Sequence, residues 1–119
     1  MMRARFGRII NIGSISGLMG NPGQANYSSS KAAMVGMSKS MAKELGAKGV
    51  TVNVVAPGFI KTEMTDALGE ELLKELAPRI PVRRLGEPQE IAHAVSWLAG
   101  EQSGYVTGQV LVVDGGLAM

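Results

Sequence analysis

Three side chains in the first third of the chain have the types and spacing needed to move a proton to or from an oxygen atom. Ser14 follows an apolar run, Tyr27 comes thirteen residues later, and Lys31 lies four residues beyond Tyr27. If this stretch is helical, Tyr27 and Lys31 share one face of the helix. An ammonium beside a phenol favours the phenolate form, and such a phenol is a usable general acid or base. The three residues are therefore candidates for acid–base chemistry.

Three short runs rich in β-branched residues predict the strands that must position these side chains. They are Arg8–Ile12, Val50–Val55 and Gln109–Val113, and glycine or proline bounds each of them. The runs are apolar almost without interruption, which is typical of strands that are buried on both faces.

Three segments between these runs have helical signatures. We expect one helix from about Gln24 to Leu45 and another from Pro88 to Ala99, which has its proline in the first turn. A shorter amphipathic helix is expected over 65–76, with Thr65 as its N-cap and a proline two residues past its end. In the first helix, five apolar residues recur at helical spacing: Ala33, Met34, Met37, Met41 and Leu45.

The order strand, helix, strand, short helix, helix, strand predicts an α/β fold with a parallel sheet and right-handed crossovers. Ligands of such sheets bind beyond the carboxyl ends of the strands, which is where Ser14 lies. Two of the three strands are edges, and an uncovered edge strand favours pairing with another chain. At this length one domain, residues 1–119, is expected.

Composition excludes several classes of function. The 119 residues include no cysteine and a single histidine, His93, so neither disulfides nor a cysteine or histidine metal site is expected. Residues 1–48 hold seven Lys and Arg against one acid, but no aromatic residues interleave with them as nucleic-acid binding would require. A pocket for an anionic small molecule fits this charge asymmetry as well. Without a membrane span or a secretory signal, a soluble cytoplasmic protein is expected.

Four motifs together resemble the short-chain dehydrogenase/reductase superfamily. They are INIGS at 10–14, YSSSK at 27–31, NVVAPG at 53–58 and VDGG at 113–116. Three further phrases resemble the bacterial 3-oxoacyl-[acyl-carrier-protein] reductases within that superfamily: NPGQANY at 21–27, GFIKT at 58–62 and RLG at 84–86. The resemblance covers essentially the whole chain.

This resemblance implies NADP(H)-dependent reduction of a 3-oxoacyl thioester. It implies that Ser14 hydrogen-bonds the substrate carbonyl and that Tyr27 donates the proton to the developing alkoxide. Lys31 is then expected to favour proton release by Tyr27 and to hold the nicotinamide ribose, so that Tyr27 and Lys31 both bind the cofactor.

The resemblance also assigns roles to the segment after the second strand. Pro57, Gly58 and Ile60 are expected to contact the nicotinamide end of the cofactor, and Thr62 its pyrophosphate. Residues 61–80 match the family's substrate lid, whose apolar helix would cover an acyl chain. Three arginines lie near the end of this segment: Arg79, Arg83 and Arg84. They either form a solvated face or contact an acidic acyl carrier protein.

The sequence departs from the family at the phosphate-binding turn. The pattern T-G-x-x-x-G-x-G, which brings backbone close to a pyrophosphate, is absent from it. The resemblance covers the C-terminal half of the family's proteins. It therefore implies half of a Rossmann-type sheet and a weak affinity of the chain for NADPH. The family buries the helix that carries Tyr27 in a dimer interface, so a homo-oligomer is expected. Met34, Met37 and Met41 suit either a core or such an interface.

Two other classes of function remain open from the sequence. The chain is a non-catalytic fragment that oligomerises or pairs with a partner through an open sheet edge, or it is a serine-based ester or lactone hydrolase. In the second case a nearby base would activate Ser14. The segment GSISG at 13–17 only superficially resembles a nucleophile elbow, because Ile15 holds its centre.

Overall fold

A parallel sheet of three strands forms the centre of this computed structural model, which describes residues 1–67 and 69–119. The strands are β1 (Gly7–Ile12), β2 (Val50–Pro57) and β3 (Val110–Val113), and β2 lies between the other two. Both pairings are parallel. The α/β fold and the three predicted strands are therefore confirmed, with strand bounds within two residues of those expected.

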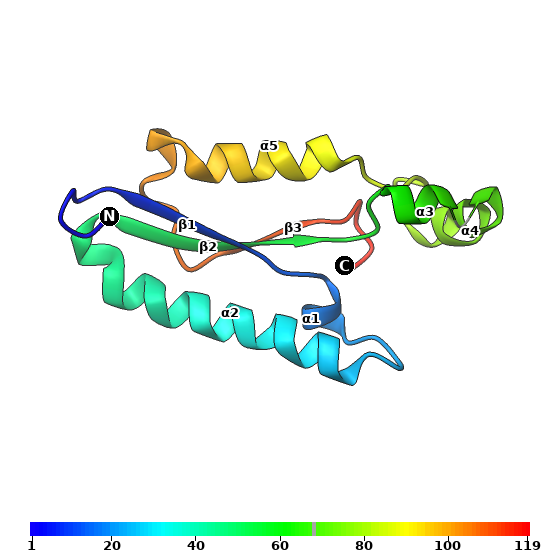
Figure 1. The fold of residues 1–119 in the computed structure, drawn as a ribbon, viewed down its shortest axis with the longest axis horizontal. Coiled ribbons are helices and arrows are strands. Elements are labelled where there is room, and N and C mark those ends of the chain that lie inside the picture. Colours follow the sequence, from blue (N-terminus) through cyan, green and yellow to red (C-terminus); the bar gives the residue numbers. More distant parts are fainter. Residues whose placement is uncertain (68) are drawn as a thin grey trace.

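Two long helices cover the two faces of this sheet. α2 (Ala25–Leu45) lies on one face and α5 (Pro88–Ala99) on the other (Figure 1). The 3₁₀ turns η1 (Gly46–Lys48) and η3 (Glu101–Ser103) follow these helices. A short helix that the sequence did not predict, α1 (Ser16–Met19), lies beside the start of α2 at the carboxyl end of the strands. In the described part of the chain, no helix is long and apolar enough to cross a membrane.

Burial on both faces holds only for the central strand. Residues 50–56 of β2 are all buried, whereas most residues of β1 and β3 are half-buried. The expectation for the two outer strands was wrong because each has one neighbouring strand and leaves its other edge open among the described residues. An apolar run therefore does not distinguish a central strand from an edge strand in a sheet this narrow.

The face of α2 that meets the sheet carries small side chains. Its buried residues are Ser38 and Ala42, whereas Ala33 and Met37, two of the apolar residues at helical spacing, are exposed. The Ser38 hydroxyl accepts a 2.9 Å hydrogen bond from the side-chain amide of Asn11 on β1. Small side chains and this polar contact fix the helix against the sheet, because they allow a closer approach than methionine would.

The predicted short helix is divided in two. α3 (Glu63–Ala67) and α4 (Gly69–Leu76) precede the 3₁₀ turn η2 (Ala77–Arg79), and Leu68 between the helices lies outside the described residues. Thr65 was wrongly expected to be the N-cap: it lies inside α3, and its N–H donates to Thr62 Oγ1 at 3.2 Å. α4 packs chiefly against η2 and α3 and has no fully buried residue, so this helical segment extends beyond the end of the sheet (Figure 1).

A buried amide ties β2 to the loop that leads into β3. The Asn53 side chain is 1% exposed. Its Nδ2 donates to the carbonyl of Val106 at 2.8 Å, and its Oδ1 accepts from the N–H of Gln109 at 3.0 Å. Because these backbone groups belong to an irregular segment, Asn53 supplies partners that no strand provides.

Candidate active site

The turn that carries Ser14 is held by the end of β2. The N–H of Gly13 donates to the carbonyl of Val55 at 2.7 Å, and the N–H of Ile15 donates to the carbonyl of Pro57 at 3.1 Å. Hydrogen bonds therefore flank Ser14 on both sides and fix it beyond the carboxyl ends of two adjacent strands. This is the edge of a parallel sheet at which ligands bind.

Tyr27 and Lys31 lie one turn apart at the start of α2. Lys31 Nζ is 5.7 Å from the centroid of the Tyr27 ring and donates to the carbonyl of Ile12 at 3.0 Å. Because Ile12 is the last residue of β1, this bond holds the ammonium at the strand's carboxyl end, close to the phenol. Ser14 Oγ accepts a 3.1 Å hydrogen bond from the N–H of Ser16, which leaves the Ser14 hydroxyl proton available to another acceptor.

Ser14 and Tyr27 line a common cavity of about 360 Å³, the Ser14 cavity. Its walls come from the turn after β1, α1, the start of α2, the segment after β2, η2 and the C-terminal turn. The lining residues are Ser14, Ile15, Ser16, Met19, Gly20, Asn21, Gln24, Tyr27, Gly58, Phe59, Arg79 and Leu117. The volume lies in the range of small-molecule sites.

Several residues with expected cofactor roles lie elsewhere. Pro57, Ile60 and Thr62 are not among the residues that line the Ser14 cavity. The Pro57 carbonyl supports the turn after β1, Ile60 lines a second cavity, and Thr62 accepts from an N–H of α3. Of the residues expected after β2, only Gly58 meets Ser14 and Tyr27 at the same cavity.

The sequence did not single out most of the other lining residues. Asn21, Gln24 and Phe59 belong to the phrases NPGQANY and GFIKT, and those phrases were the available signal. Arg79 and Leu117 reach the cavity from η2 and from the C-terminal turn. No spacing in the sequence connects these two residues with Ser14, so only the fold brings them together.

The described residues around Ser14 do not form a Ser–His–Asp triad. No histidine and no carboxylate is among the described residues that line the cavity, and His93 lies on α5. Activation of a serine nucleophile needs an adjacent base that a third group orients. Nor do the described residues bring three or more His, Asp or Glu side chains together as a metal site.

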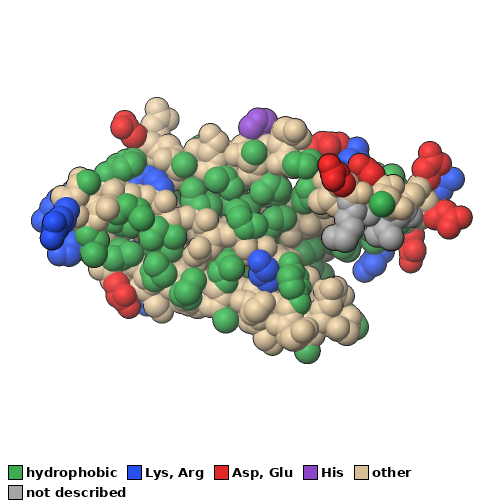
Figure 2. Space-filling view, viewed as in Figure 1, with side chains coloured by type: hydrophobic (Ala, Val, Ile, Leu, Met, Phe, Trp, Pro, Cys, Tyr) green, Lys and Arg blue, Asp and Glu red, His purple; other side chains and the backbone are tan. Residues whose placement is uncertain are grey.

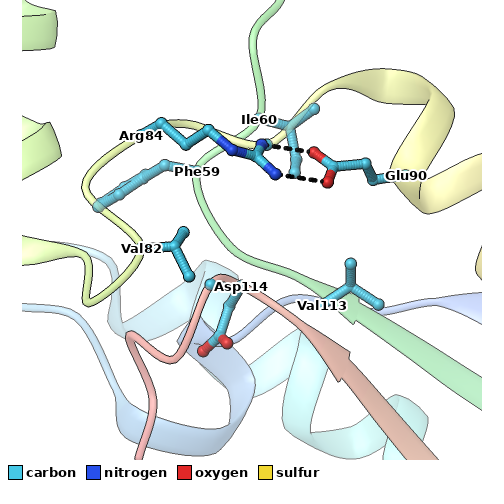
Figure 3. Close-up of a pocket in the computed structure, with 9 residues that line it drawn as sticks. Phe59, Ile60, Val82, Arg84, Glu90, Val113 and Asp114 are labelled. Carbon is cyan, nitrogen blue, oxygen red and sulfur yellow. Dashed lines mark hydrogen bonds and ion pairs between the residues drawn. The ribbon is translucent and has the colours of Figure 1, made fainter.

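A second cavity of about 190 Å³ lies between the segment after β2 and the end of β3. Arg84 and Glu90 form two hydrogen bonds of 2.8 Å beside it (Figure 3). The Asp114 carboxylate turns away from this pair and accepts from the N–H groups of Gly116 and Ala118 at 2.8 and 2.6 Å. The charged side chains that line this second cavity therefore already have hydrogen-bond partners within the protein.

The Arg84–Glu90 pair predicts a weaker fold in acid. The hydrogen bond from Arg84, supported by the N–H of Glu87, lowers the pKa of Glu90 from its ordinary 4.5 to about 2. A lowered carboxyl pKa in the folded state stabilises the fold above pH 4.5, and this contribution is lost as the pH falls from 4.5 towards 2. We expect Glu90→Gln to lower the thermal unfolding midpoint at neutral pH. The difference should disappear at the acid end of a pH series; a constant difference would contradict the assignment.

Comparison with known proteins places this chain in a family. A family model described as enoyl-(acyl carrier protein) reductase matches residues 1–118. The chain belongs to the short-chain dehydrogenase/reductase superfamily. The resemblance expected from the motifs is thereby confirmed.

Its relatives include bacterial 3-oxoacyl-[acyl-carrier-protein] reductases. One of them, FabG from Haemophilus influenzae, is 57% identical to this chain over 117 residues, which cover 98% of this chain and 48% of the relative. The FabG protein of Vibrio cholerae is 54% identical over 119 residues, which cover 100% of this chain and 49% of the relative. A crystal structure of 3-oxoacyl-[acyl-carrier protein] reductase from Brucella melitensis superimposes with a TM-score of 0.93 at 39% identity, covering 100% of this chain and 45% of that one. The chain thus spans about half the length of the relatives it matches.

Proposed function

We propose that this chain carries the carbonyl-binding and proton-donating half of an NADP(H)-dependent reductase of 3-oxoacyl thioesters. The observation that carries the proposal is the shared cavity of Ser14 and Tyr27, with the Lys31 ammonium held 5.7 Å from the Tyr27 ring. The names of the relatives supply the substrate class. The acyl carrier protein is then the proposed partner that delivers the thioester.

The proposed chemistry follows from the hydrogen bonds at the site. Ser14 Oγ accepts from the N–H of Ser16, and its own proton remains free to be donated to the substrate carbonyl oxygen. Tyr27 donates its phenolic proton to that oxygen as negative charge develops on it. The Lys31 ammonium stabilises the phenolate that Tyr27 leaves behind.

The donor set fits one end of a nicotinamide cofactor, and that cofactor supplies the hydride when it is bound. Tyr27 and Lys31 are proposed to hold the nicotinamide ribose, with Gly58 at the cavity wall. Pro57, Ile60 and Thr62 are proposed to contact the cofactor from the segment beyond β2. Because the sequence has no glycine-rich phosphate-binding turn, we expect the affinity for NADPH to be weak.

The lid segment is proposed to cover the acyl chain. Leu72, Leu73 and Leu76 of α4 are only half-buried, and this helix stands away from the sheet. Closing these side chains over an alkyl chain would remove apolar surface from water, at roughly 25 cal/mol per Å² buried.

The test combines a titration with a turnover assay. The purified chain is titrated with NADPH, and NADPH oxidation is followed with an acetoacetyl thioester. We expect saturable but weak binding, with thioester-dependent oxidation above the level of a Tyr27→Phe control. Oxidation that is equal in the two proteins would reject reductase activity of this chain.

A second candidate function is association through the open edge of β1. Within the described residues β1 pairs only with β2, and Ile12 at its end is 44% exposed. Hydrophobic side chains gather on the face between α5 and α2 (Figure 2), and Met37 of α2 and Trp97 of α5 are 50% and 56% exposed. An unpaired edge flanked by apolar side chains favours a second copy of the chain or a partner strand.

Light scattering over a range of protein concentrations tests this association. We expect an oligomer that shifts towards the monomer in Ile10→Lys, because an added charge on this half-buried residue of β1 opposes edge pairing. Val112→Lys on β3 is the matched control and is expected to leave the oligomer intact. A wild-type chain that remains monomeric at high concentration would refute the candidate.

A further inference from the structure

The charges around the Ser14 cavity are unbalanced. Arg79 is the only Lys, Arg, Asp or Glu among the described residues that line it. The polar side chains of the opposite wall are neutral, and two of them are already paired, because Asn21 Nδ2 donates to Gln24 Oε1 at 2.8 Å. A single cation therefore faces a cavity in which no described side chain neutralises it.

The neighbouring cations have partners within the chain. Arg84 pairs with Glu90 at 2.8 Å, and Lys61 pairs with Glu87 at 2.6 Å. The guanidinium of Arg83 donates to a backbone carbonyl at 2.8 Å. Arg79 takes part in neither of these ion pairs, so it differs from Lys61, Arg83 and Arg84 in being available to a ligand.

Arg79 is nevertheless attached to a fixed part of the fold. The next residue, Ile80, is 1% exposed. Its N–H donates to the carbonyl of Ala77 at 3.1 Å, and its carbonyl accepts from the N–H of Arg83 at 2.8 Å. A Cβ on Gly115 would lie 2.8 Å from Ile80 Cγ2, which shows how closely Ile80 packs against the turn after β3. The backbone at Arg79 is thus fixed by the core, unlike that of α4.

We propose that Arg79 is a specificity-determining residue that binds an oxyanion carried by the carbonyl substrate. This inference rests on the proposed function, because it places the reacting carbonyl at Ser14 and Tyr27. A guanidinium presents paired N–H donors whose spacing matches a carboxylate or a phosphate. The anion and the reacting carbonyl would occupy the same cavity of about 360 Å³, so the two groups must lie close together in the substrate. Its two possible sources are a carboxylate on the oxo-acid or acyl side and the phosphate of a pantetheine arm.

Matched ligands separate these two sources without requiring turnover. Acetoacetate is compared with methyl acetoacetate, and pantetheine 4′-phosphate with pantetheine. Binding to the full chain is followed by the amide NMR shifts of Gly58, Phe59 and Leu117, which line the cavity. The wild type, Arg79→Gln and Arg79→Lys are titrated, with Lys74→Gln as a control that removes an exposed charge from α4.

We expect the charged member of at least one pair to bind on the order of tenfold more tightly than its neutral partner, which is the weight of one hydrogen bond to a charged group. Arg79→Gln should abolish this preference, Arg79→Lys should retain part of it, and Lys74→Gln should retain all of it. The pair that responds identifies the source of the oxyanion, and a response in both pairs indicates a general oxyanion site.

Three results would overturn the inference: no charge preference in the wild type, no saturable binding of either charged ligand, or a preference that survives in Arg79→Gln. The proposed function fails separately. A Tyr27→Phe chain should keep the charge preference, so loss of reductase activity and loss of oxyanion binding are distinguishable.

Discussion

Replacing Tyr27 with phenylalanine is expected to lower the rate of thioester-dependent NADPH oxidation by about 10²- to 10⁴-fold, the usual contribution of a positioned proton donor. The substitution removes one oxygen atom and leaves the ring in place. The ring lies at the wall of the Ser14 cavity and is 42% exposed, so the fold loses little. Steady-state rates of NADPH oxidation with an acetoacetyl thioester measure the effect.

Tyr105→Phe provides the matched control for this prediction. Tyr105 is fully exposed, and it does not line the Ser14 cavity. Its substitution should leave the rate unchanged. If Tyr27→Phe retains the wild-type rate while binding NADPH equally well, the proton comes from another group and the proposed role of Tyr27 is wrong.

The second large effect is expected from Asn53→Leu, which should lower the free energy of unfolding by about 3 kcal/mol. The substitution leaves the carbonyl of Val106 and the N–H of Gln109 without their side-chain partners, and each unsatisfied buried group costs about 1–3 kcal/mol. The leucine also adds an apolar side chain of different shape at a position that is 1% exposed. Urea unfolding followed by circular dichroism measures the loss.

Gln102→Leu is the control for Asn53→Leu, because Gln102 is exposed in η3. We expect a change within about 0.5 kcal/mol for that variant. Equal stability of Asn53→Leu and the wild type would mean that other groups hold the loop before β3, and the assigned role of Asn53 would then be incorrect.

Local sequence patterns were sufficient to predict the three strands and the two long helices of this fold. β-branched runs bounded by glycine and proline located the strands, because strand propensity and chain-breaking residues are local properties. Whether a residue is buried, in contrast, is not a local property of the sequence. The outer strands are rich in β-branched residues, as β2 is, but lack a second neighbour. The face of α2 that packs on the sheet is defined by Ser38 and Ala42 rather than by Met37.

The candidate site divides in the same way. Ser14, Tyr27 and Lys31 could be singled out because a strand end and a helical turn determine where such residues lie. That Ser14 and Tyr27 share a cavity with Arg79 and Leu117 could not be foreseen, since these residues enter from η2 and from the C-terminal turn. Tertiary contacts between distant segments therefore determine which side chains line this part of the cavity.

The hydrogen bond from Lys31 to Ile12 also limits how the sheet can be extended. The N–H groups of Gly7 and Gly13 point to β2, and backbone groups alternate in direction along a strand, so the carbonyl of Ile12 faces the opposite side. Lys31 Nζ already occupies that acceptor at 3.0 Å. An incoming strand can therefore form a ladder with the earlier residues of β1 but must diverge before its last one, which leaves the lysine and the phenol beside it undisturbed.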